Sequence, residues 1–242
     1  MNGFPAEVYQ RNETMKKKIL PSLILIVALL AASAFCTASC TLTGGEDKTS
    51  AKRSDDFTGC LFIGDSRTCA LEMTDSLPGA DFFCKEGWTV FGAASESIFI
   101  DGGIYDLRAR LSSRDYDKVY VLLGINEIGG DLDAVTEKYS ELISTIRSFQ
   151  PEAKVIIQAN PHVTTARSSQ GDAVNNANVD LLNQKLRSLT DGTAVFWLDA
   201  NQILDGETGG LNEAYAEADG LHPNRDCCIA WGRWILSQNG NF

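Results

Sequence analysis

The stretch from Cys60 to Thr68 constrains the fold more than any other part of the chain. It begins with four consecutive apolar residues, Cys60-Leu61-Phe62-Ile63, and continues at once into Gly64-Asp65-Ser66. An unbroken apolar run is typical of a short strand buried on both faces of a parallel sheet. Gly64 permits a tight turn, so we expect Ser66 just beyond the carboxyl end of the strand, where ligands bind in open α/β sheets. Taken alone, the stretch favours a simpler role for Ser66 as a helix N-cap.

A second segment, near the C-terminus, favours a chemical role for Ser66. The sequence Asp219-Gly220-Leu221-His222 contains one of only two histidines in the chain. A serine nucleophile needs a base to accept its proton, and that base needs an acceptor that fixes its tautomer. His222 and Asp219 are therefore candidates for the base and for the residue that orients it.

A third segment carries a side-chain amide at a strand end. Leu122-Leu123 completes another apolar run, and Gly124-Ile125-Asn126-Glu127 follows as a turn. An asparagine in this position can donate a hydrogen bond to an oxyanion.

These segments together resemble the SGNH (GDSL-like) hydrolase family. The blocks of that family are a Gly-Asp-Ser turn, a Gly after the second strand, a Gly-x-Asn-Asp turn and an Asp-x-x-His near the C-terminus. In this chain they correspond to Gly64-Asp65-Ser66, the stretch Gly87 to Gly92, Gly124-Ile125-Asn126-Glu127 and Asp219-Gly220-Leu221-His222, in the same order. The ordered set is far more specific than any single block, and the resemblance spans roughly residues 58–238.

Two departures from the family pattern concern the oxyanion site. Glu127 stands where the family usually has Asp, which looks like a subgroup variant and leaves Asn126 intact. The Gly-x-x-Gly of the family would place Val90 at the second Gly. Gly87 is our candidate for the second oxyanion donor, with Val90 and Gly92 as alternatives.

The resemblance implies a fold and a mechanism. The expected fold is a flavodoxin-like, three-layer αβα sandwich with a five-stranded parallel sheet. The expected activity is ester hydrolysis through Ser66 as nucleophile, His222 as base and Asp219 as orienting carboxylate. The oxyanion would be bound by Asn126 and by the backbone N–H groups of Ser66 and Gly87. The implied reaction needs no cofactor.

Composition and motifs exclude several other classes of protein. The formal net charge of −11 makes the chain a poor partner for nucleic acid or anionic membranes, which are bound through Lys and Arg. No Gly-x-Gly-x-x-Gly or Walker loop indicates a nucleotide site. Two histidines and no C-x-x-C pair make a zinc site improbable. No Gly-x-Ser-x-Gly elbow indicates an α/β-hydrolase.

The N-terminal part has the pattern of an export leader. Met15-Lys16-Lys17-Lys18 followed by the apolar residues 19–35 forms a charged n-region and an apolar h-region. Ordinary cleavage fits Ala32-Ser33-Ala34, whereas Thr37-Ala38-Ser39-Cys40 resembles a bacterial lipoprotein box and is favoured; an uncleaved anchor is the third option. We expect residues 1–14 to be a mis-called start, 15–40 the leader, 41–57 a linker and 58–242 the hydrolase domain. The protein would then be exported, as a cell-surface lipoprotein or in secreted form.

Strand and helix patterns alternate along the domain, which predicts a parallel sheet with helices on both faces. The predicted strands are Leu61–Ile63, Asp81–Glu86, Lys118–Leu123, Lys154–Gln158 and Ala194–Leu198. The predicted helices are Arg67–Leu77, Tyr105–Leu111, Asp133–Phe149, Arg225–Leu236 and one that carries Val179, Leu182, Leu186 and Leu189. The run Ser97–Ile100 is ambiguous, and 164–172 and 201–218 are predicted loops.

Several single residues admit two interpretations. Arg67 either binds substrate or forms a surface ion pair, and Trp88 either stacks on a sugar ring or packs in the core. His162 is more readily structural or substrate-lining than catalytic. The domain cysteines, Cys60, Cys69, Cys84, Cys227 and Cys228, are mostly interpreted as small buried apolar residues, although export would permit disulfides.

The predicted substrate is a short acyl ester, acetyl above all, on a glycan outside the cell. The polar loop 201–218 leads directly to Asp219, which favours a shallow, wet cleft, whereas long acyl chains need an apolar pocket. The alternatives are a lipase or lysophospholipase of the same family, and a non-catalytic surface binding protein on the same fold.

Overall fold

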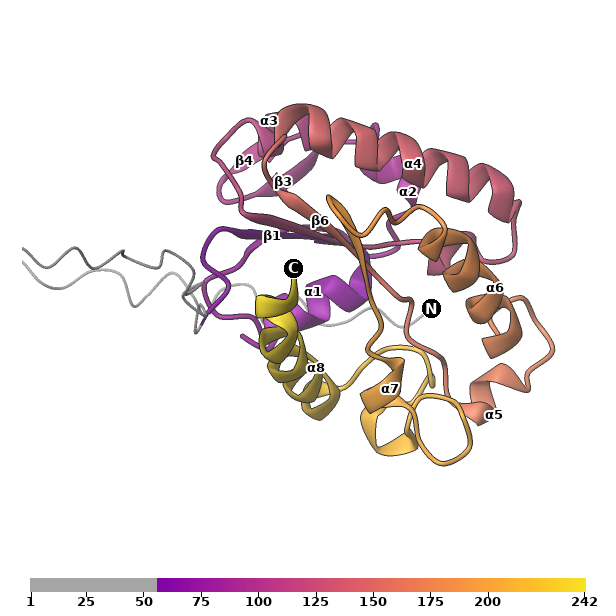
Figure 1. The fold of residues 1–242 in the computed structure, drawn as a ribbon. Coiled ribbons are helices and arrows are strands. Elements are labelled where there is room, and N and C mark those ends of the chain that lie inside the picture. Colours follow the sequence, from indigo (N-terminus) through magenta and orange to yellow (C-terminus); the bar gives the residue numbers. More distant parts are fainter. Residues whose placement is uncertain (1–55) are drawn as a thin grey trace, which may run out of the picture. The chain divides into compact units, whose positions relative to one another are not determined.

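A five-stranded parallel sheet forms the centre of the protein (Figure 1). The computed structural model describes residues 56–242, so the leader, both processing sites and nearly all of the linker lie outside the described residues. The strands run side by side in the order β2-β1-β5-β6-β7, and every neighbouring pair is parallel. Their bounds are β1 (Cys60–Gly64), β2 (Asp81–Cys84), β5 (Lys118–Leu122), β6 (Lys154–Gln158) and β7 (Val195–Leu198).

Helices cover both faces of this sheet, which gives three layers (Figure 1). One apolar cluster joins alternate strand residues such as Val119 and Val121 to the helices α2 (Val90–Ala93), α3 (Leu107–Leu111), α4 (Leu132–Phe149) and α6 (Asn176–Arg187). A second cluster joins the other strand residues, among them Phe62 and Tyr120, to α1 (Ser66–Met73), α7 (Asn201–Leu204) and α8 (Arg225–Gln238). Because both faces of the strands are buried, their sequences are continuous apolar runs.

The predicted αβα sandwich is therefore confirmed, with its five-stranded parallel sheet. Taken in chain order, the strands occupy the positions 2-1-3-4-5 of the flavodoxin-like arrangement. The first helix is shorter than predicted, because α1 ends at Met73 and Asp75 then adopts a positive φ of 51°. The second strand is also shorter, because its pairing with β1 stops at Cys84 opposite Gly64.

Short helices and strands occupy segments that the sequence analysis left ambiguous or predicted as loops. The ambiguous run forms β3 (Ile98–Ile100), which pairs antiparallel with β4 (Gly103–Tyr105) as a separate two-stranded ribbon. The two predicted loops contain α5 (Thr165–Ser168), α7 and the 3₁₀ turn η3 (Glu213–Tyr215). Further 3₁₀ turns are η2 (Ile125–Glu127) and η4 (Asn239–Asn241). Among the residues described, no helix has the length and apolar character needed to span a membrane.

The carboxyl ends of β1 and β5 are brought together at one edge of the sheet. Gly64 ends β1 directly beside Leu122 of β5. A Cβ atom on Gly64 would lie 2.7 Å from the Leu122 carbonyl oxygen and closer still to Thr68 Oγ1, so the turn accepts only glycine. This confirms the predicted steric role of Gly64 and places the turn bearing Ser66 beside the turn bearing Asn126.

Candidate active site

Ser66 is the first residue of α1, immediately after the turn that ends β1. Asp65 is the helix N-cap, and its carboxylate accepts a hydrogen bond from the Arg67 backbone N–H at 3.0 Å. Asp65 thus holds the turn, and the N-cap of α1 is Asp65 rather than Ser66. This leaves the Ser66 hydroxyl, which is partly exposed, available for other partners.

The structure brings Ser66, His222 and Asp219 into one hydrogen-bonded chain. Ser66 Oγ lies 3.0 Å from His222 Nε2, although 156 positions separate the two residues in the sequence. On the other side of the ring, His222 Nδ1 lies 2.5 Å from Asp219 Oδ2. A hydroxyl, an imidazole and a carboxylate in this order are the groups that activate a serine nucleophile.

Backbone hydrogen bonds fix Asp219 in position to orient the ring. Its Oδ1 accepts from the backbone N–H groups of Leu221 at 2.9 Å and His222 at 3.0 Å. Partial burial acts to raise the pKa of Asp219, but the hydrogen bonds from the His222 ring and from these two amides outweigh it and lower the pKa. Asp219 is thus held as a carboxylate, the form that supports an imidazolium.

Two neighbouring side chains of η2 hold the loop that follows β2. Asn126 Nδ2 donates to the Trp88 carbonyl oxygen at 2.8 Å, and Glu127 Oε1 accepts from the Val90 N–H at 2.5 Å. Through this contact Glu127 links its own turn to the loop that follows β2. An amide group carries two N–H donors, so Asn126 keeps one for a ligand.

The three candidates for the second oxyanion donor differ in their hydrogen bonding. The Val90 N–H is engaged by Glu127, and the Gly92 N–H donates to Thr89 Oγ1 at 3.0 Å, which caps α2. Gly87 is exposed and has a φ of 67°, a left-handed conformation that favours glycine.

Arg67 is buried, and both roles predicted for it are wrong. Its side chain is 1% exposed, and its Nε and Nη2 atoms donate to the two oxygens of Asp65 at 3.0 and 2.7 Å. Nη2 also donates to Asn160 Oδ1 at 2.7 Å. The charged groups of Arg67 and Asp65 are both removed from water. The guanidinium therefore neither forms an ion pair at the surface nor faces a substrate. It locks the turn from which Ser66 projects.

A network of amides continues from Arg67 along the edge of the sheet, and sequence reasoning missed it. Asn160, at the end of β6, donates to the Leu123 carbonyl oxygen at 3.1 Å. Its backbone groups bond to the side chains of Asn183 and Asn201. The only signal in the sequence was the position of Asn160 at a strand end, since the other two amides lie within helices.

His162 belongs to this edge of the sheet through a pair of carboxylates. Its Nδ1 lies 2.8 Å from Asp205 and its Nε2 lies 3.0 Å from Asp180. Burial acts to lower the pKa of His162, but the two carboxylates raise it overall. These contacts fit the structural role that was favoured for His162.

Trp88 is a core residue, which confirms the packing role of the two predicted for it and contradicts stacking on a sugar. Its side chain is 2% exposed and packs on Phe83 with ring centroids 5.1 Å apart. Its Nε1 donates to Glu96 at 3.1 Å. A ring enclosed in this way presents no face to a ligand.

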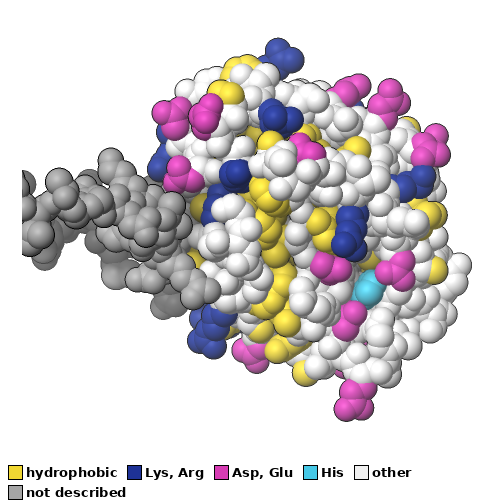
Figure 2. All heavy atoms as spheres, in the orientation of Figure 1, with side chains coloured by type: hydrophobic (Ala, Val, Ile, Leu, Met, Phe, Trp, Pro, Cys, Tyr) yellow, Lys and Arg dark blue, Asp and Glu magenta, His cyan; other side chains and the backbone are white. Residues whose placement is uncertain are grey.

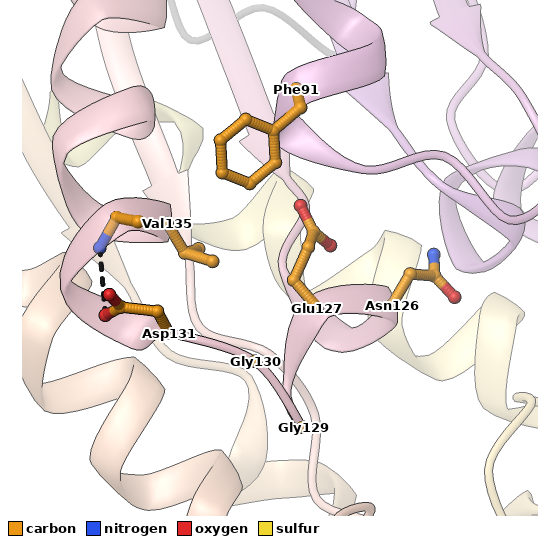
Figure 3. Close-up of a pocket in the computed structure, with 8 residues that line it drawn as sticks. Phe91, Asn126, Glu127, Gly129, Gly130, Asp131 and Val135 are labelled. Atoms are coloured by element: carbon orange, nitrogen blue, oxygen red, sulfur yellow. Dashed lines mark hydrogen bonds between the residues drawn. The ribbon is translucent and has the colours of Figure 1, made fainter.

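A surface cavity of about 370 Å³ lies next to Asn126 (Figure 3). Phe91 and Glu127 extend toward one another on one side of η2, whereas the Asn126 side chain points to the other side. The cavity is lined by Phe91, Asn126, Glu127, Gly129, Gly130, Asp131, Ala134 and Val135. In the part of the chain that the structure describes, no cluster of His, Cys, Asp and Glu has the arrangement of a metal site.

Comparison with known families identifies the chain. Residues 62–226 match the model of the GDSL-like Lipase/Acylhydrolase family. This stretch contains the turn of Ser66, the Asn126 turn and the Asp219–His222 segment, and it makes up most of the chain. The chain belongs to the GDSL-like lipase/acylhydrolase family. It is therefore a hydrolase that acts on ester bonds, and the predicted family resemblance is confirmed.

Solved structures share the fold of this GDSL-like hydrolase at low sequence identity. A protein assigned as a platelet activating factor from Streptococcus pneumonia is 18% identical, with a TM-score of 0.61 over 74% of this chain and 83% of that one. An active-site mutant of a family two carbohydrate esterase from Clostridium thermocellum is 14% identical, with a TM-score of 0.54 over 75% and 63%. An acetyl esterase mutant with acetate ion is 17% identical, with a TM-score of 0.50 over 75% and 94%. No curated protein sequence matches the chain.

Glu127 gives this GDSL-like hydrolase a pH-dependent stability. Burial raises its pKa to about 7, although the Val90 N–H acts in the opposite direction. The folded protein therefore retains a proton on Glu127 at pH values where the unfolded chain has released it. Where the native state binds more protons than the unfolded state, the free energy of unfolding decreases as pH rises.

We predict that Glu127→Gln removes this loss of stability. Glutamine keeps an oxygen that can accept from Val90 but has no proton to release. The melting temperature of the variant minus that of the wild type should therefore increase from pH 4.5, the ordinary value, to about 7, and then level off. Thermal unfolding across this pH range measures the difference, and Glu137→Gln, at an exposed position, is the control. A difference that stays constant with pH would contradict the account.

Proposed function

We propose that the protein is an exported serine esterase that removes short acyl groups, acetyl above all, from a glycan. One observation carries the catalytic part of this proposal, the continuous hydrogen-bonded chain from Ser66 Oγ through His222 to Asp219. Membership of an ester-hydrolysing family supports it independently.

The proposed reaction is acyl transfer in two steps. Ser66 Oγ attacks the ester carbonyl carbon while His222 Nε2 takes the hydroxyl proton, and the alcohol leaves with that proton. The acyl group is then bound to Ser66. His222 next takes a proton from water, whose oxygen attacks the acyl carbon; the bond to Ser66 Oγ then breaks, His222 returns the proton to Ser66 Oγ, and the acid is released. Asp219 stabilises the imidazolium in both steps.

The oxyanion of each tetrahedral intermediate needs donors next to Ser66. The Ser66 N–H lies in the first turn of α1, where backbone donors lack partners within the helix. Asn126 supplies its second amide hydrogen, since the first binds Trp88. Gly87 is the proposed third donor, because the single N–H groups of Val90 and Gly92 are already engaged. One such donor is worth about 10²–10³ in rate.

The surroundings of the site support a small acyl group and a polar alcohol. The cavity of about 370 Å³ is lined by Asn126 but not by Ser66 or His222, and its volume is near the lower end of the range of about 300–1,000 Å³ for small-molecule sites. Exposed polar residues such as Glu213 and Glu217 occupy the loop before His222. Acidic side chains are also spread over the face of the molecule that Figure 2 shows. Structural neighbours include one protein described as a carbohydrate esterase and one described as an acetyl esterase.

Export and lipid attachment are the remaining parts of the proposal. They rest on the sequence alone, through the lysines before residue 19, the apolar run that follows and the lipoprotein-like box ending at Cys40. A polar linker after Cys40 would connect the lipid to the domain.

The first prediction of the proposed function concerns the nucleophile. Ser66→Ala should lower kcat for ester hydrolysis by about 10⁴–10⁶-fold, because loss of one member disables the whole unit. Replacing His222 with Asn should lower kcat by about as much, and the variant that carries both substitutions should be no slower than either single variant. Initial rates on nitrophenyl acetate measure this, with circular dichroism to verify folding. His162→Asn is the control for a histidine outside the unit, and near-normal activity of Ser66→Ala would refute the assignment.

The second prediction concerns the substrate. Initial rates should fall from nitrophenyl acetate to butyrate to palmitate, because the loop before His222 is polar and exposed, whereas a long acyl chain needs an apolar pocket. Acetylated polysaccharides should release acetate, and the Ser66→Ala protein, used as the blank, should release none. Preference for palmitate would replace this proposal with a lipase or lysophospholipase function. Absence of hydrolysis on every ester would favour a binding protein.

The third prediction concerns the anchor. The mature protein should begin at Cys40 and carry lipid, and Cys40→Ala should release it from membranes or block its processing. One acyl chain anchors only marginally, so stable attachment needs a second. Intact mass of the mature protein tests this, with Cys36→Ala as the matched control. An unlipidated N-terminus between residues 33 and 35 would show simple secretion instead.

A further inference from the structure

The side chains of Cys69 and Cys84 meet between α1 and the end of β2. Their Sγ atoms lie 2.9 Å apart, although the residues are 15 positions apart in the sequence. Cys69 is on α1, three residues after Ser66, and Cys84 is the last residue of β2. We propose that these two cysteines are a site of oxidation and form a disulfide bond in the mature protein.

The other cysteines of the described domain are unsuited to this role. Cys60, Cys227 and Cys228 are 3%, 0% and 0% exposed, enclosed in the apolar cluster beneath α8. Cys69 and Cys84 are both partly exposed. The five cysteines of the domain therefore consist of one accessible pair and three buried apolar side chains. An odd number of cysteines is thus compatible with a single disulfide bond.

The distance and the surroundings of the pair permit the bond. A disulfide has an S–S length of about 2.0 Å, so the sulfur atoms need to approach by about 0.9 Å, within reach of small side-chain rotations. Cys84 lines a surface cavity of about 360 Å³ together with Glu72 and Phe99, which gives a reagent access. Cys84 Sγ donates a hydrogen bond to Glu72 Oε2 at 3.3 Å.

The reaction requires a disulfide-containing oxidant, either a small molecule such as oxidised glutathione or an oxidised carrier protein. The Cys69 thiolate attacks one sulfur of that disulfide and displaces the other as a thiolate. Cys84 then loses its proton and attacks the Cys69 sulfur of the mixed disulfide, which releases the second thiolate. The protein loses two electrons and two protons, and the oxidant becomes two thiols.

The bond would connect two elements that carry the proposed site. It would tie α1, whose first residue is Ser66, to the strand end that leads into the loop at Gly87. A disulfide that closes a loop of this size stabilises mainly by restricting the unfolded chain. The inference does not depend on ester hydrolysis, because the same pairing is expected in the Ser66→Ala protein.

Incubation of the reduced full-length protein with oxidised glutathione tests the proposal. We expect the protein to lose two hydrogen atoms in mass, and peptide mapping to find Cys69 linked to Cys84. The melting temperature should rise by about 5–10 °C over the reduced form, the rise expected for such a loop in a domain of this size. Cys84→Ser should abolish both changes, and Cys60→Ala should retain them.

Three outcomes would overturn the proposal. Cys69 and Cys84 could stay free thiols in the oxidised sample, each could carry glutathione without linking, or the linked peptides could contain other cysteines. Mapping of the wild-type protein decides among these outcomes even if the Cys84→Ser variant does not fold.

Discussion

The structure depends on the buried ion pair between Asp65 and Arg67. Both side chains are almost completely removed from water, and the guanidinium reaches across to Asn160 at the end of β6. Removing one partner from a buried pair typically costs about 3–5 kcal/mol, because the other charge is left without compensation. Asp65 also caps α1. One pair therefore sets the start of the helix and the direction of Ser66, and it links the turn after β1 to Asn160 beyond β6.

The sheet turns this local constraint into a site. Ser66 follows β1, the loop held by Asn126 and Glu127 follows β2, and η2 follows β5, so three neighbouring strands deliver their turns to one edge. The Asp219–His222 segment reaches the same edge from the far end of the chain. A bridge between Ala216 and Pro223 and the bond from the Thr164 N–H to the Gly220 carbonyl fix that segment. Groups far apart in the sequence thereby lie within hydrogen-bond distance.

Local patterns predicted much of this arrangement, because the information was contained in short stretches. The apolar runs of β1, β5 and β6 marked buried strands, and the spacing of Asp219 and His222 allowed both to sit on one turn. Long-range burial was not readable in the same way. Nothing in Gly-Asp-Ser-Arg shows that Arg67 turns inward to Asp65. The sequence left two roles open for Trp88, and only its packing on Phe83 decides between them. The ribbon of β3 and β4 escaped prediction because each strand has only three residues.

The central claim is that Ser66 is a nucleophile activated by His222. Labelling of the active protein with a fluorophosphonate probe, followed by peptide mapping, tests it most directly, because the probe reacts with an activated serine. The account predicts one phosphonylated residue, Ser66, and loss of the adduct in the His222→Asn protein. An adduct on a different residue, or an active enzyme that the probe leaves unlabelled, would contradict it.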